Sequence, residues 1–247
     1  MVMIIRILNK AQYLKLFFFF AMGIVVGYEL NAESIQIEKN INPFKLYPKD
    51  ISFEVKRNEE IIGFHKVTFE LITDNRISVV AEMKINVFFL GFPIYKYSYF
   101  SNAQWQDGYL QNLAAKQNDD GDKSEVIIRR NKKRLNITGP NGDTSGAIEL
   151  LPSNHWNSRI LGMNKVIDTI KGKVADITIQ DKGVERIKVK GGIVLATKYV
   201  FGGDVDANVW YHRSGRWVKL QFRAEDNSII ELLCQECGVS EFIMAGN

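Results

Sequence analysis

The chain has 247 residues, 46% of them hydrophobic, two cysteines and a formal net charge of +4. A chain of this length can bury a full core, so its fold does not depend on disulfide staples. A nucleic-acid partner is not expected, because such a partner requires a clustered basic face. The one basic cluster, residues 129–134, lies around a predicted turn.

The first 32 residues have the pattern of a cleavable secretory signal peptide. Three cations precede an apolar run from Leu16 to Val26, and the chain becomes polar after Ala32. An uncleaved membrane anchor is the alternative, but the run is shorter than the roughly 20 residues of a spanning helix. We expect cleavage near Ala32, a periplasmic or secreted product, and membrane contact only through the signal segment before cleavage.

The rest of the chain, residues 33–247, is expected to form a single antiparallel β domain with a net charge of about +2. Residues 33–49 have no clear period and predict an extended lead-in. After them, apolar and polar residues alternate, most clearly over 77–87, as in half-buried strands. Turn dipeptides such as Asp107-Gly108 separate the runs. The pattern predicts an all-β fold with one short helix, whose curved sheet forms a half-barrel or barrel of about ten strands.

One stretch, residues 153–171, departs from this alternation. Its apolar residues have a spacing closer to that of a helix, and Asn157 or Ser158 is placed to cap it. We expect a helix over about 157–170, packed at the mouth of the sheet or in its concavity.

Four segments together resemble a family of exported bacterial proteins of unknown function. They are FEVKRNEEIIGFHKVTF (53–69), LLPSNHWN (150–157), VWYHRSGRWVKLQF (209–222) and CQECG (234–238). This resemblance implies no activity. The order of elements also resembles, more loosely, the periplasmic half-barrels that carry lipids or lipoproteins. That second likeness implies an apolar cavity, but a fold does not determine a function.

Cys234 and Cys237 form a C-x-x-C motif directly before Gly238. In an exported protein the simplest interpretation is a disulfide. The chain must then turn there, because three residues of extended strand separate Cα atoms by about 10 Å, beyond the ~7 Å limit for a bridge. A metal half-site and a redox-active pair are the alternatives. The motif follows a strand rather than opening a helix, which argues against redox use.

His155 lies in the densest polar and aromatic patch of the chain, Ser153–Asn157. Imidazole titrates near neutral pH, so His155 is the candidate catalytic acid or base, or a ligand. In the alternative, structural interpretation, Asn154, His155 and Asn157 hydrogen-bond the loop that enters the helix, and Trp156 packs on the sheet.

No metal site and no cofactor are predicted. The acidic run 118–122 lacks the alternating ligands and the distal Glu of a calcium loop, so a hairpin turn explains it better. A serine nucleophile in a G-x-S-x-G motif is also absent from the sequence.

The strands carry more apolar residues than a one-sided sheet needs. Either the helix and the lead-in cover the second face, or the sheet encloses a ligand cavity, as small barrels do. The residues expected to bind the ligand are Phe88, Phe92, Tyr95, Tyr97, Tyr99 and Trp156.

These observations favour a non-enzymatic binding or carrier protein for an apolar or lipidic component of the cell envelope. Burial of acyl surface, about 0.8 kcal/mol per methylene, would hold the ligand. The alternatives are an envelope hydrolase centred on His155 and a structural partner of an envelope complex. An apolar cavity would favour the first function, and a polar cleft around His155 the second.

Overall fold

A computed structural model describes residues 41–240, 242 and 243. The predicted signal peptide, residues 1–32, lies outside them. The elements are α1 (Pro43–Leu46), β1 (Ile51–Arg57), β2 (Glu60–Thr73), β3 (Arg76–Phe89), β4 (Phe92–Gln106), β5 (Tyr109–Asp119), β6 (Asp122–Arg130), β7 (Leu135–Gly139), β8 (Gly142–Gly146), the 3-10 turn η1 (Ser158–Gly162), β9 (Lys165–Asp168), β10 (Lys173–Val189), β11 (Gly192–Gly203), β12 (Ala207–His212), β13 (Trp217–Arg223) and β14 (Ile229–Glu236).

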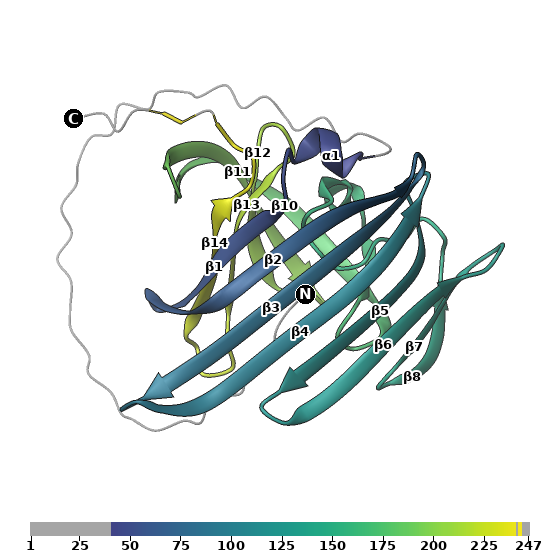
Figure 1. Cartoon of the computed structure of the whole chain (residues 1–247), viewed down its shortest axis with the longest axis horizontal. Helices are drawn as coiled ribbons and strands as arrows, with labels where there is room; N and C mark the ends of the chain where they lie inside the picture. Colours follow the sequence, from purple (N-terminus) through teal and green to yellow (C-terminus); the bar gives the residue numbers. More distant parts are fainter. Residues whose placement is uncertain (1–40, 241, 244–247) are drawn as a thin grey trace.

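All the strands form one antiparallel sheet in the order β8-β7-β6-β5-β4-β3-β2-β1-β14-β13-β12-β11-β10-β9. β1 pairs with both β2 and β14, so two meanders meet at the first strand. The sheet curves into a nearly closed barrel (Figure 1), which confirms the predicted class. It has fourteen strands rather than about ten, in part because β7, β8 and β9 have only four or five residues each. Such short runs show too little alternation to be recognised.

The helix predicted over 157–170 is wrong. Only Ser158–Gly162 form a single 3-10 turn, and Lys165–Asp168 belong to β9. Asn157 does cap the turn, since its side chain accepts a hydrogen bond from the Arg159 amide at 3.1 Å. The segment is buried on several sides rather than along one stripe, so its apolar spacing imitates a helix.

A four-residue α-helix lies instead in the lead-in that was expected to be extended. Asn42 caps α1 by accepting from the Phe44 amide at 2.9 Å, and Pro43 occupies the first turn, where a missing N–H costs nothing.

The connection between β8 and β9, residues 147–164, crosses the inside of the barrel, and we call it the crossing segment. Its residues Leu151 and Ser153 hydrogen-bond Ile167 of β9 through the backbone, at 2.8 and 2.9 Å. On the same side, Gly139 and Gly172 touch: a Cβ at Gly139 would lie 2.7 Å from the Gly172 Cα. The crossing segment and this glycine contact therefore bring the two edges of the sheet together.

The barrel has two distinct ends (Figure 1). The β2–β3 and β4–β5 turns and α1 lie at one end, and the β3–β4 hairpin projects from the other. None of the helical segments within the described residues is long and apolar enough to cross a membrane.

Gly63 provides a test of the β1–β2–β3 register. A Cβ there would lie 1.9 Å from the Lys84 carbonyl oxygen, a backbone atom that cannot move away alone. We expect Gly63→Ala to lower the free energy of unfolding by about 2–3 kcal/mol, as overpacking does. Urea denaturation measures it. Gly202→Ala is the control, because its Cβ would meet only the Thr178 hydroxyl, at 3.1 Å. Equal effects of the two substitutions would contradict the register.

Candidate functional site

The crossing segment is held by two tyrosine hydroxyls inside the barrel. Tyr47, which follows α1, donates to the Trp156 carbonyl at 3.0 Å and accepts from the Trp217 amide at 3.0 Å. Tyr211 of β12 donates to the His155 carbonyl at 3.0 Å. Both hydroxyls are buried, and burial raises the pKa of each far above that of a free tyrosine. They therefore remain protonated donors and fix the backbone at His155 and Trp156.

His155 lies in an aromatic cage rather than in a polar cleft. Its side chain is 3% exposed, and its ring lies 5.5 Å from the rings of both Phe201 and Trp217. Neither ring nitrogen has a hydrogen-bond partner among the described residues. Burial lowers the pKa of His155 well below its ordinary value, so the ring is neutral. A general base needs a reachable proton and an orienting partner, and the cage supplies neither to His155.

A second buried histidine, His65 of β2, shares this cage. Its ring lies 5.6 Å from that of Trp217 and 6.0 Å from that of Phe53. Burial lowers the pKa of His65 to about 4. Both histidines are thus uncharged members of the core at neutral pH.

The structure divides the six predicted ligand-binding residues into separate groups. Tyr95, Tyr97 and Tyr99 are buried inside the barrel. Their hydroxyls donate to Asp119 at 2.7 Å, Gln117 at 3.3 Å and Thr169 at 2.9 Å. Burial raises the pKa of all three. All three side chains are core residues with bonded hydroxyls, and Tyr99 also borders a pocket of about 530 Å³ between β3 and β6.

Phe88 and Phe92 lie instead on the outside, in the hairpin between β3 and β4. We call residues 88–94 the apolar tip. Its five large apolar side chains are between 48% and 82% exposed: Phe88, Phe89, Leu90, Phe92 and Ile94. A scattered exposed leucine is ordinary, but a contiguous apolar projection marks an interaction surface.

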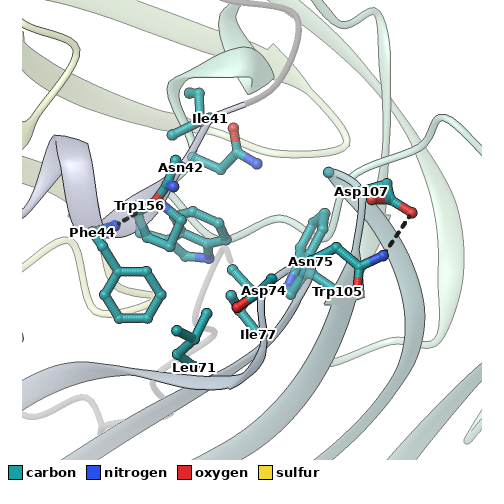
Figure 2. Close-up of a pocket in the computed structure, with 13 residues that line it drawn as sticks. Ile41, Asn42, Phe44, Leu71, Asp74, Asn75, Ile77, Trp105, Asp107 and Trp156 are labelled. Atoms are coloured by element: carbon teal, nitrogen blue, oxygen red, sulfur yellow. Dashed lines mark hydrogen bonds between the residues drawn. The ribbon is translucent and has the colours of Figure 1, made fainter.

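Trp156, the last predicted ligand residue, borders a cavity of about 240 Å³ at the α1 end (Figure 2). Figure 2 shows Trp156 and Trp105 in the middle of the lining, with Phe44 on one side and Asp107 on the other. The two indoles meet edge to face, with centroids 5.6 Å apart. The cavity also includes Asp74.

Sequence reasoning missed this cavity, although a signal existed. Asp74-Asn75 and Asp107-Gly108 are turn dipeptides that end neighbouring hairpins of one meander. Alternate turns of an antiparallel meander lie at the same end of the sheet. Their side chains could therefore have been placed together before the structure was known.

The predicted disulfide is confirmed. Cys234 and Cys237 are bonded, with Cα atoms 6.0 Å apart, and Gly238 follows in the left-handed region at φ +67°. The chain turns at the end of β14, as the spacing requires. Arg216 links the turn after β14 to α1, because its guanidinium donates to the carbonyls of both Gly238 and Leu46. Within the described residues, no group of three or more His, Cys, Asp or Glu side chains is arranged to hold a metal ion.

The buried histidines predict acid-sensitive stability. The unfolded chain protonates each near pH 6.5, whereas burial lowers the pKa of His65 to about 4 and that of His155 well below its ordinary value in the folded protein. The unfolded state therefore binds more protons below pH 6.5, so the free energy of unfolding decreases as the pH is lowered. Between pH 7.5 and pH 5, where most carboxylates remain ionised, His65 should lower the free energy of unfolding by about 2 kcal/mol, and His155 should lower it further.

His155→Phe isolates one of these contributions. The decrease in unfolding free energy between pH 7.5 and pH 5 should be clearly smaller in the variant than in the wild type, measured by urea denaturation at each pH. An unchanged pH dependence would show that His155 is not a buried neutral group.

No curated protein matches this chain. A beta-barrel-like protein of domain of unknown function DUF1849 from Brucella abortus has a similar crystal structure, with a TM-score of 0.51 and 8% identity over 79% of this chain and 99% of that one. This likeness concerns the fold alone. The family model of the domain of unknown function DUF6134 matches residues 53–235. The chain therefore belongs to the DUF6134 family.

Proposed function

We propose that this protein is an exported, non-enzymatic binding protein that contacts a lipidic component of the cell envelope through its apolar tip. The single observation that carries the proposal is the exposure of five large apolar side chains in a seven-residue projection. The disulfide supports export, because such bonds persist in oxidising compartments. Burial of acyl chains against the tip replaces the interior cavity as the expected mode of binding.

The turn of the apolar tip has an apolar residue at a position where a polar residue would favour folding. Leu90 and Gly91 both have positive φ, +50° and +83°, and connect the paired residues Phe89 and Phe92. Such two-residue turns favour Asn or Asp before Gly, because positive φ causes steric strain in most other residues. Asp107 and Asp120 hold the same position in their turns, at φ +52° and +50°.

Leu90 therefore stands where a polar residue would stabilise the fold more. It is also the most exposed large apolar residue of the described chain, at 82%. Leu90 has an unfavourable backbone conformation and exposes apolar surface to water, so it does not stabilise the folded monomer. Contact with an apolar environment would supply the missing stabilisation, at roughly 1.5–3 kcal/mol for a fully buried leucine or phenylalanine.

The charges near the apolar tip do not favour an anionic surface. Lys84 and Lys96 face outward on β3 and β4. Lys84 is paired with Glu82 at 2.7 Å. Asp120, whose carboxylate accepts from the Lys96 backbone amide at 3.3 Å, adds a negative charge beside β4. The proposed contact is therefore hydrophobic, with acyl chains rather than headgroup charge as its basis.

The competing functions have weaker support. A hydrolase centred on His155 would need an accessible polar cleft, and the cage around this residue is aromatic. A structural role in a protein complex would use the same apolar tip. Binding to pure lipid vesicles separates that role from the proposal.

Leu90→Asn tests the proposal with effects of opposite sign. The free energy of unfolding should rise by about 0.5–1 kcal/mol, because Asn adopts the left-handed turn more readily. Partitioning onto vesicles of zwitterionic phospholipid should weaken about tenfold or more, since an apolar side chain is lost from the contact. Flotation with the vesicles measures binding, and urea denaturation measures stability.

Ile72→Asn is the matched control. Ile72 is 43% exposed but lies near the β2–β3 turn, at the other end of the barrel. Its replacement should leave vesicle binding unchanged. No binding of the wild-type protein to vesicles, or equal losses in both variants, would overturn the proposal.

Vesicles with added anionic lipid provide a further prediction. Because Lys84 has an acidic partner on the surface and Lys96 lies beside Asp120, anionic lipid should not strengthen binding, and added salt should not weaken it. Strong salt dependence in the same flotation assay would instead point to a headgroup contact.

A further inference from the structure

The cavity in Figure 2 has a polarity that differs from that of the apolar tip. It lies at the α1 end, so it is separate from the surface used in the proposed function. We propose that this cavity binds one ring of a neutral carbohydrate. The hydrogen-bonding groups, apolar walls, charge and size of the cavity all match such a ring.

Two buried donors in the lining lack acceptors. The indole nitrogens of Trp105 and Trp156 have no hydrogen-bond partner among the described residues, although both side chains are at least 98% buried. Figure 2 shows the nitrogen edges of both rings turned toward the part of the lining where Asp74 lies. Buried N–H groups without acceptors are rare in native proteins. A ligand oxygen in the cavity would satisfy them after a small rotation of the rings, because neither nitrogen touches the open space as it stands.

Two carboxylates at the cavity supply hydrogen-bond acceptors that complement the indole donors. Asp74 and Asp107 line the cavity, and neither forms an ion pair within the described part of the chain. From the described residues, the Asp107 carboxylate accepts one long hydrogen bond, 3.5 Å, from the Asn75 side-chain amide. Carboxylates accept without donating, whereas indoles donate without accepting. A hydroxyl group does both, so a polyhydroxylated ligand matches the two sets together.

Charge and apolar surface narrow the ligand class. Among the described residues the lining contains no Lys, Arg or His, although Arg159 donates to the carbonyl of the lining residue Gly108 at 3.0 Å. Two carboxylates against this one cation disfavour an anionic sugar. Phe44, Leu71 and Ile77 provide apolar walls, which suit the C–H face of a sugar ring. The volume of about 240 Å³ corresponds to about eight water molecules. This space accommodates one hexose ring rather than an oligosaccharide.

The test is a titration of the purified protein with glucose and with N-acetylglucosamine, followed by tryptophan fluorescence. Trp105 and Trp156 lie in the lining, so a saturable change in emission is expected, with half-saturation in the millimolar range. Glucuronate should bind at least tenfold more weakly, because Asp74 and Asp107 repel its carboxylate.

Asp107→Asn should weaken binding of the neutral sugar about tenfold, as the loss of a charged acceptor does. Asp120→Asn is the matched control, since Asp120-Gly121 forms an equivalent turn that does not line the cavity. Maltose that binds as well as glucose would identify a glycan end as the source of the ring, and glucose binding alone would identify the free sugar.

The absence of any saturable change up to about 100 mM of either neutral sugar would overturn this inference. Equal effects of Asp107→Asn and Asp120→Asn would also overturn it. Leu90→Asn should leave sugar binding unchanged, so failure here and failure of the lipid proposal are distinguishable.

Discussion

The pairing of β1 with β14 determines much of the molecule. By joining the first strand to the last, it makes β8 and β9 the edges of the sheet. The residues that connect those edges must then cross from one to the other, and they do so through the interior. Trp156 and Ile160, each 1% exposed, thereby become core residues. The tyrosine hydroxyls that hold this segment are a consequence, because its buried carbonyls need donors.

The crossing segment occupies part of the barrel interior, and the two surfaces proposed for binding lie at the ends of the barrel. In a small barrel, inward side chains either fill the lumen or leave room for one ligand. Here the crossing segment and residues such as Tyr97 and Trp217 occupy the inside. The surplus of apolar residues that suggested an enclosed cavity therefore has two explanations. Part of it packs around the crossing segment, and part of it lies exposed at the apolar tip.

The sequence contained the fold class but not the paths of its short segments. Long strands such as β3 could be recognised because one face is buried and the period of two is uninterrupted. The same logic failed for residues 157–170, which are surrounded on several sides and so follow no single period. The disulfide could be predicted because it depends only on local spacing. The environment of His155 could not, because its cage comes from β11 and β13, at least 40 residues farther along the chain.

The residues predicted to bind a ligand also show that the sequence alone does not reveal which apolar side chains are exposed. Phe92 and Tyr95 are only three positions apart, yet one is exposed and the other is inside. Strand alternation separates their faces, and the turn lifts the apolar tip beyond the neighbouring strands. Composition alone counts both as apolar surplus. Only the registers of β3 with β2 and β4 show which of them faces water.

The two ends of β3 have opposite chemistry, and the strand keeps them apart. Fourteen residues at 3.2–3.4 Å each separate the ends by about 45 Å. The apolar tip is hydrophobic and gains from leaving water, whereas the α1 end carries carboxylates that remain hydrated. A molecule that buries its tip in lipid would therefore hold the α1 end in the aqueous phase, several Debye lengths from the surface at physiological ionic strength. At that distance the charge of the lipid would not affect the cavity. The two proposed sites would thus act independently, and the β-strands would fix the separation between their ligands.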